Sequence, residues 1–322
     1  MNGVRWARHA PVGQHAGRTW KAGPAIAAGL ALLVSPPAVR AQSNGENGVV
    51  RSVLLPAVRH FASPVADPFE PRFAIGLVRT NLFESVGPER PDYTTSPGTD
   101  AEVQATAAIG ATFPIALIAG ASGSVVIAVQ AGVFARFRIQ KPSRDDLGQD
   151  WVVGVPIEMA WNNASARIRI AHRSSHLGDE FSESTGAQRV EVGGETIDGL
   201  FALRFGAVRV YGGGGWVFHS NTDNTDILRD LDREDRFTLQ AGGDAEFRPF
   251  TNRRLSIVAG ADWQSNERTN WHSMFALAAA IRATAGSRDI RFTTRYSGGA
   301  SALGQFFLTR EQAWSVELAF GL

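Results

Sequence analysis

Residues 151–161, WVVGVPIEMAW, have the pattern that most clearly indicates the fold class. Its odd positions carry only large apolar side chains, with a tryptophan at each end, whereas its even positions include Gly154, Glu158 and Ala160. Successive side chains of a β-strand point to opposite faces, so one face of this segment is wholly apolar. This pattern is typical of a strand that crosses about 25 Å of hydrocarbon with an aromatic residue at each membrane interface.

The same period of two recurs along the chain. Residues 255–263 alternate apolar side chains with Ser256 and Asp262, and residues 314–322 alternate to the last position, Leu322. That ending resembles the C-terminal signal of outer-membrane barrels. We predict twelve strands, an even number as in single-chain bacterial barrels. They lie near residues 73–84, 101–113, 123–139, 150–161, 164–175, 190–205, 207–219, 235–248, 254–265, 271–284, 289–298 and 312–322.

The connections support this interpretation because short and long ones largely alternate. The short ones are at 162–163, 206, 249–253 and 285–288, and the long polar ones are at 85–100, 140–149, 176–189, 220–234 and 299–311. Short periplasmic turns and long outer loops are typical of outer-membrane proteins. The predicted fold is therefore an all-β, antiparallel, up-and-down transmembrane β-barrel of about twelve strands, with both termini in the periplasm.

A soluble secreted β-domain, built as a sandwich, is the alternative, since its strands also alternate. The polar face of nearly every strand carries charges, however, among them Arg136, Arg169, Asp198, Asp244 and Glu317. Charges on that face can pair across the lumen of a barrel. This favours the barrel.

The first 41 residues have the features of a secretory signal peptide. A basic stretch ends at Lys21, an apolar run from Ala25 to Val34 follows, and Val39-Arg40-Ala41 offers small residues before a cleavage site after Ala41. The apolar run is about half the length of roughly twenty residues that a spanning helix needs. We expect export to the outer membrane of a diderm bacterium.

Residues 42–71 are predicted to form an irregular N-terminal arm, against or inside the barrel of residues 72–322. Pro56, Pro64, Pro68 and Pro71 exclude a long helix or a central strand from this segment. Removing residues 1–41 changes the balance from 32 basic and 31 acidic residues to 27 and 31, because five basic residues and no acid are lost. An acidic mature chain does not suggest a nucleic-acid partner. Outer-membrane lipids and, during biogenesis, the barrel-assembly machinery are the expected partners.

Residues 167–180, RIRIAHRSSHLGDE, contain the strongest candidates for chemistry. Strand parity places His172 and Ser174 together on the outward face, near the outer rim. A histidine and a serine so placed can act as general base and nucleophile if a carboxylate orients the imidazole. Glu191 and Glu195 on the next predicted strand can do so. His176, Gly178 and Asp179 form a loop motif after this strand, and the alternative is that all these residues are ordinary parts of the rim.

The His-x-Ser pair resembles the motif of outer-membrane phospholipase A and of the lipid A 3-O-deacylases. That resemblance implies a lipid acyl hydrolase with His172 as base and Ser174 as nucleophile, although Ser175 stands where those families have asparagine. A second resemblance rests on residues 55–73, 172–180 and 296–307, which look like the bacterial family catalogued as domain of unknown function 1207. It implies an envelope protein and no particular activity.

One further site is considered for a metal. His219, Asp223 and Asp226 precede or occupy a long outer loop, and the hard oxygen ligands of the two aspartates suit calcium. The spacing of these three residues matches no known calcium-loop signature. Apart from this possible calcium, no cofactor is expected. The first functional hypothesis is an envelope barrel without established catalysis, as a narrow pore or a structural protein. The acyl hydrolase and the soluble secreted β-domain are the alternatives.

Overall fold

The structure is a computed structural model that describes the ranges 50–85, 102–141, 144–186, 192–220, 236–252, 254–269, 271–286, 288–307 and 309–321, together with residue 189. The signal peptide expected over residues 1–41 lies outside the described residues. No helix in the described ranges is long and apolar enough to cross a membrane.

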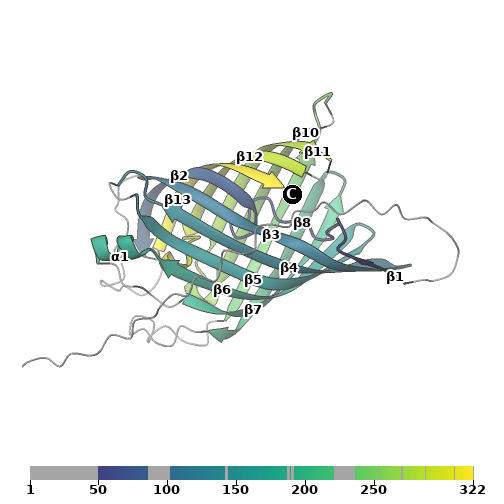
Figure 1. Cartoon of the computed structure of the whole chain (residues 1–322), viewed down its shortest axis with the longest axis horizontal. Coiled ribbons are helices and arrows are strands. Elements are labelled where there is room, and N and C mark those ends of the chain that lie inside the picture. The colour runs from purple at the N-terminus through teal and green to yellow at the C-terminus, as the bar shows by residue number, and fades with distance from the viewer. Residues whose placement is uncertain are drawn as a thin grey trace, which may run out of the picture. The chain divides into compact units, whose positions relative to one another are not determined.

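The described chain forms a closed antiparallel β-barrel, as predicted (Figure 1). Each long strand pairs with the next along the chain, and the first, β2, also pairs with the last, β13, which closes the ring. The twelve barrel strands in the described ranges are β2 (Phe73–Ser85), β3 (Glu102–Gly120), β4 (Gly123–Phe137), β5 (Asp146–Trp161), β6 (Ala164–Leu177), β7 (Val192–Phe205), β8 (Val208–Ser220), β9 (Phe237–Phe247), β10 (Leu255–Asn266), β11 (Met274–Ala285), β12 (Arg288–Ala300) and β13 (Thr309–Gly321).

Alternation along each strand separates an apolar outer face from a polar lumen. On β5, Val153 is 58% exposed on the outer face, whereas Val152 is 4% exposed and Glu158 is fully buried. A two-residue period produces this result because adjacent side chains of a strand point to opposite sides. The expectation that the charged face lines the lumen is confirmed.

Exposed aromatic side chains gather near both ends of the outer face. The strand ends that lead into long connections carry Trp151, Trp216, Trp263 and Trp314. The opposite strand ends carry Trp161, Phe205 and Phe247 beside short turns and Phe320 at the end of β13. Between these two aromatic belts the exposed side chains are mainly valine, isoleucine and leucine.

Two elements differ from the sequence prediction. The strand expected over 101–113 continues to Gly120, and its register shifts between Pro114 and Ala116. A bulge absorbs a residue that the ladder cannot pair, so proline interrupts the pairing locally without ending the strand. The arm expected to be irregular contains a short strand, β1 (Arg51–Leu54), which pairs with residues 116–119 of this extension. Leu55, with a φ of 48°, and Pro56 then end β1.

At the end of the barrel with the long connections, two short helices are joined by a small apolar core. Helix α1 (Asp179–Thr185) follows β6, and the 3-10 helix η3 (Gly304–Phe306) lies between β12 and β13. Phe181 and Phe306 meet edge to face with ring centroids 6.0 Å apart. Leu147, Leu177 and Leu303 complete this core, so the β12–β13 connection is packed against β5 and β6.

Candidate functional site

Three neighbouring strands bring a carboxylate and two histidines together on the outer face of the barrel. His172 of β6 is the register partner of Glu195 of β7, and Glu195 is in turn the partner of His219 of β8. His172 Nδ1 lies 3.1 Å from Glu195 Oε1, and His219 Nδ1 lies 2.6 Å from Glu195 Oε2. The carboxylate thus holds one imidazole on each side.

A β-bulge turns His219 to the outer face. In β8, Arg209 and Tyr211 are buried toward the lumen, and strict alternation would send His219 the same way. The pairing skips one residue, however, because Thr196 is opposite Val217 while Glu195 is opposite His219. A bulge inserts one extra residue and so reverses the parity beyond it. Sequence periodicity alone misses this member of the cluster.

Ser174 lies on the same outward face of β6, two residues after His172. Its register partners are Trp151 on β5 and Gly193 on β7, so it is level with the aromatic belt at the long-loop end. The described side chains of His172 and Ser174 form no hydrogen bond with each other. Because Glu195 engages Nδ1 of His172, the other ring nitrogen, Nε2, is the atom that can accept a proton from a hydroxyl.

The other predicted site residues have different positions. Glu191 lies outside the described residues, as do Asp223 and Asp226 of the possible calcium site. His219 contacts Glu195 instead. In the described part of the chain no group of three or more histidine or acidic side chains is arranged to hold a metal ion.

The loop motif after β6 has a structural role in the barrel. A Cβ at Gly178 would lie 1.8 Å from the carbonyl oxygen of Asp146, so only glycine fits where β6 passes into α1. Asp179 begins α1 and forms an ion pair with Arg189. His176 is exposed at the end of β6, where it extends the outward row of His172 and Ser174.

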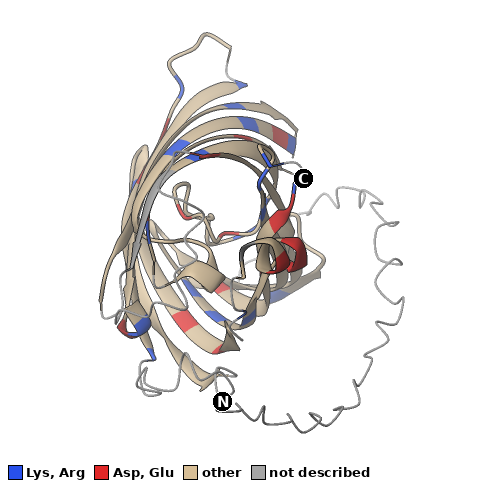
Figure 2. Cartoon of the chain, turned by 90° about the vertical axis from the view of Figure 1, so that its left-hand side faces the viewer, with Lys and Arg blue, Asp and Glu red and all other residues tan. Residues whose placement is uncertain are grey.

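A second region, which the sequence did not reveal in detail, lies inside the lumen. Residues 55–72, which connect β1 to β2 along the chain, run inside the ring of barrel strands (Figure 2). We call this segment the lumen arm. Glu158 of β5 is fully buried, and its Oε1 accepts hydrogen bonds from Arg59 Nε at 3.0 Å and Nη2 at 2.6 Å. Its Oε2 accepts the backbone N–H groups of His60 and Phe61 at 2.8 and 3.1 Å.

Two further ion pairs fix the returning half of the lumen arm. Glu70 Oε1 lies 2.5 Å from Arg167 Nη1, and Arg72 donates to both carboxylate oxygens of Glu317 at 2.7 to 2.9 Å. Burial by itself raises the pKa of Glu70, but the guanidinium groups of Arg167, Arg169 and Arg59 lower it to about 2. The ionised carboxylate is therefore the form that holds the arm.

Apolar and aromatic contacts fill the space between these ion pairs. Phe61 is fully buried, and the guanidinium carbons of Arg167 and Arg209 lie 5.1 and 5.3 Å from its ring centroid. Arg209 Nη1 also donates to the carbonyl oxygen of Ala62 at 2.5 Å. The alternating charges of the strands thus pair with the lumen arm as well as across the lumen. The sequence feature that could have indicated these contacts is the presence of charged residues, Arg59, Glu70 and Arg72, among the prolines of the arm.

Comparisons with known proteins concern both the family and the architecture. The family DUF1207, described as a protein of unknown function, matches residues 92–321. No curated protein matches the chain.

Among solved structures, the outer membrane phospholipase of Salmonella typhi, a dimer with bound calcium, is similar with a TM-score of 0.48 and 11% identity, over 79% of this chain and 93% of that one. Outer membrane phospholipase A of Escherichia coli has a TM-score of 0.47 and 10% identity, over 77% and 92%. The β domain of the Bordetella autotransporter BrkA has a TM-score of 0.37 and 10% identity, over 78% and 98%. β-Barrels with different activities resemble one another to this degree, so the similarity gives no indication of an activity.

Proposed function

This chain belongs to the DUF1207 family, for which no function is established, and we propose its role from the structure of the barrel. It is an outer-membrane protein of a diderm bacterium, and its own N-terminal arm closes the lumen of the barrel. The observation that carries the membrane assignment is the outer face, apolar between two belts of exposed aromatic residues. Such a face is costly in water and stable in lipid.

The lumen arm argues against an open diffusion pore. It holds lumen-facing carboxylates and guanidinium groups of β5, β6 and β13 in buried ion pairs, which line the space through which ions would have to pass. We expect the purified protein to insert into planar bilayers and to conduct poorly. A large, steady conductance of the unmodified protein would contradict the closed-lumen proposal and favour a pore.

Export is part of the same proposal. Residues 1–41 act as a signal peptide, and the outer-membrane assembly machinery recognises the alternating C-terminal strand. Mass spectrometry of the protein purified from outer membranes tests the first statement, because we expect the mature chain to begin at Gln42. A chain that retains residues 1–41 in the outer membrane would contradict cleavage. Recovery in a detergent-free soluble fraction would contradict the membrane assignment.

A second candidate function, a lipid acyl hydrolase, is supported by the contact between His172 and Glu195 on the outer face. In this reaction Ser174 Oγ attacks the carbonyl carbon of an acyl ester while Nε2 of His172 accepts the hydroxyl proton. The alcohol leaves with that proton, and water then releases the fatty acid from the acyl-serine. Glu195, 3.1 Å from Nδ1, fixes the orientation of the imidazole and stabilises its charged form. The substrate would be a lipid of the outer leaflet, since the cluster is level with Trp151 on the lipid side.

The chain offers a matched control for the hydrolase. Ser174 points outward, whereas its neighbour Ser175 is 6% exposed and faces the lumen. We expect Ser174→Ala to abolish fatty-acid release from phospholipid or lipopolysaccharide, and Ser175→Ala to retain it in the folded barrel. Equal activity in the two variants, or no release by the unmodified protein, would exclude this function.

A further inference from the structure

A chamber with a built polar lining lies in the lumen between the arm and the β12–β13 connection. Its volume is about 280 Å³, its lining includes Phe69 of the lumen arm and Gly304 of η3, and its walls come from β5 to β10. Small-ligand sites in proteins begin at roughly this size, about 300 Å³. Its lining includes Ser174 of the outer-face cluster but neither His172 nor Glu195.

Glycines make one wall of the chamber open. On β8, Gly214 and Gly215 line it, and on β7 Gly193 and Gly194 do so. A Cβ at Gly215 would lie 2.9 Å from both Asp198 Cβ and Thr238 Oγ1, so any side chain there would crowd these polar groups. The glycines of β7 and β8 therefore let backbone and small polar side chains form the surface of the chamber.

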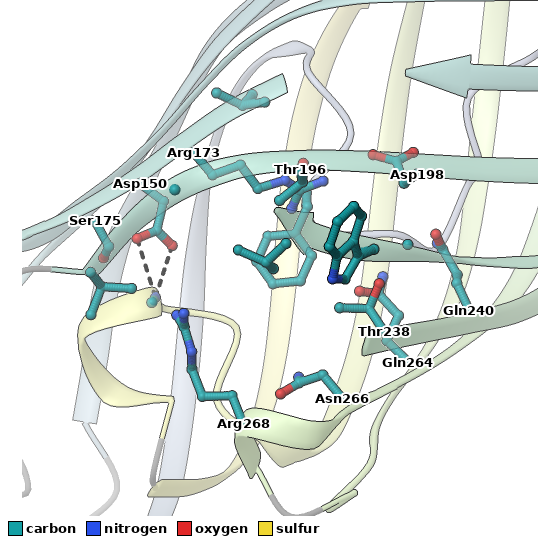
Figure 3. Close-up of a pocket in the computed structure, with 18 of the residues that line it drawn as sticks. Asp150, Arg173, Ser175, Thr196, Asp198, Thr238, Gln240, Gln264, Asn266 and Arg268 are labelled. Carbon is teal, nitrogen blue, oxygen red and sulfur yellow. Dashed lines mark hydrogen bonds between the residues drawn. The ribbon is translucent and has the colours of Figure 1, made fainter. Parts of the chain in front are cut away.

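A guanidinium without a carboxylate partner reaches into this space. Arg173 extends from β6 into the chamber (Figure 3), and its guanidinium carbon lies 5.9 Å from the ring centroid of Phe69. Within the described residues it forms no ion pair, whereas its neighbour Arg169 is neutralised by Asp198 at 2.9 Å. Arg268 extends toward the chamber from the opposite side, and its Nη2 lies 3.4 Å from Ser220 Oγ.

The lining contains a second carboxylate, Asp150, which contacts the backbone of the β12–β13 connection. Both of its oxygens accept the N–H of Gly304, at 3.2 and 3.1 Å, which fixes η3 beside the chamber (Figure 3). Arg173 is therefore a guanidinium of the lining that a ligand can neutralise, since its neighbour Arg169 is already paired with Asp198. The chamber favours a negatively charged group.

Two glutamines supply acceptors on another side. Gln240 Nε2 donates to Asp67 at 2.9 Å and to Asp262 at 2.8 Å, and Gln264 Nε2 donates to the same two carboxylates at 3.0 and 2.8 Å. Because both amide nitrogens are engaged, the amide oxygens of these residues are the atoms available to a ligand. They accept hydrogen bonds, so they suit a ligand that carries N–H or O–H groups.

We infer that the chamber binds a small organic acid that also carries hydrogen-bond donors, such as an amino acid with an acidic side chain. Its carboxylate pairs with Arg173, and its ammonium or hydroxyl groups donate to the amide oxygens of Gln240 and Gln264. The ring of Phe69 packs against its carbon chain, so the ligand rests directly on the lumen arm.

Isothermal titration of the full chain in detergent micelles tests this inference, with L-glutamate as the probe. We expect saturable binding at millimolar or lower concentration. Arg173→Gln should weaken it by about tenfold or more, since a hydrogen-bonded charge pair contributes at least that much. Arg248→Gln removes an exposed arginine that does not line the chamber, and should leave the affinity unchanged. Glutarate, which lacks the ammonium group, should bind more weakly than glutamate.

Three results would overturn the inference. They are no binding of L-glutamate to the unmodified protein, equal affinity in Arg173→Gln, and equally tight binding of inorganic phosphate, which would indicate a simple anion site. If circular dichroism shows that Arg173→Gln does not fold, Phe69→Leu replaces it, because Phe69 lines the chamber and its ring packs against the carbon chain of the ligand in this inference. Unchanged affinity in that variant would overturn the inference as well.

Discussion

Glu158→Gln is the sharpest perturbation of the closed lumen. The substitution keeps the size of the side chain and removes the charge that holds Arg59 and the backbone of His60 and Phe61. Glu158 is fully buried and accepts four hydrogen bonds from the lumen arm, two of them from a guanidinium. After the substitution an amide must face Arg59, and one of its two oxygen acceptors becomes an NH₂ donor.

The magnitude follows from the burial of the pair. Removing one partner of a buried ion pair costs about 3–5 kcal/mol, because the other charge remains without compensation. Arg59 is 25% exposed, so the lower end, about 3 kcal/mol, is appropriate. That free energy corresponds to roughly a hundredfold increase in the population with a detached arm.

Single-channel recording in planar bilayers measures that population directly. We expect brief opening events in Glu158→Gln, about a hundredfold more frequent than in the unmodified protein. Glu246→Gln is the control, because Glu246 pairs with Arg282 and Arg248 on the barrel wall and contacts no residue of the lumen arm. The reasoning is refuted if Glu158→Gln inserts and stays as closed as the unmodified protein, or if Glu246→Gln opens equally often.

Two further predictions concern the same arm. The pKa of Glu70 is lowered from 4.5 to about 2, so its ionised form stabilises the docked arm above pH 4.5, and this contribution is lost as the pH falls toward 2. Opening events should therefore become more frequent as the pH falls through this range in the unmodified protein, and should change less in Glu70→Gln. If the opening frequencies of the two proteins depend on pH in the same way, the ion pair of Glu70 with Arg167 does not hold the arm. Gly260→Leu should also open the lumen, because a Cβ at this position already lies 3.0 Å from Cβ of Val65 in the arm. Unchanged conductance with an intact barrel would show that the arm accommodates the larger side chain.

The site was only partly predictable from sequence. Parity along β6 correctly placed His172 and Ser174 on the outward face, since no bulge interrupts the pairing of residues 164–177 with β5. Glu195 was one of two candidates, and the structure shows its contact with His172. The direction of the His219 side chain could not be predicted, because a bulge near Val217 reverses it. The presence of that bulge depends on how β8 pairs with β7.

The barrel, its strand order and its two faces were predictable from the pattern of residues along the chain. A period of two requires only local backbone geometry, and a chain of alternating strands with short and long connections closes in one order. The occupant of the lumen, in contrast, depends on contacts between residues far apart in the chain. Arg59 and Glu158 are 99 residues apart and Arg72 and Glu317 are 245 apart, and no local pattern pairs them. Many charged side chains of the lumen could form ion pairs with the arm. Which of them do so depends on the strands that the closed ring places opposite each residue of the arm.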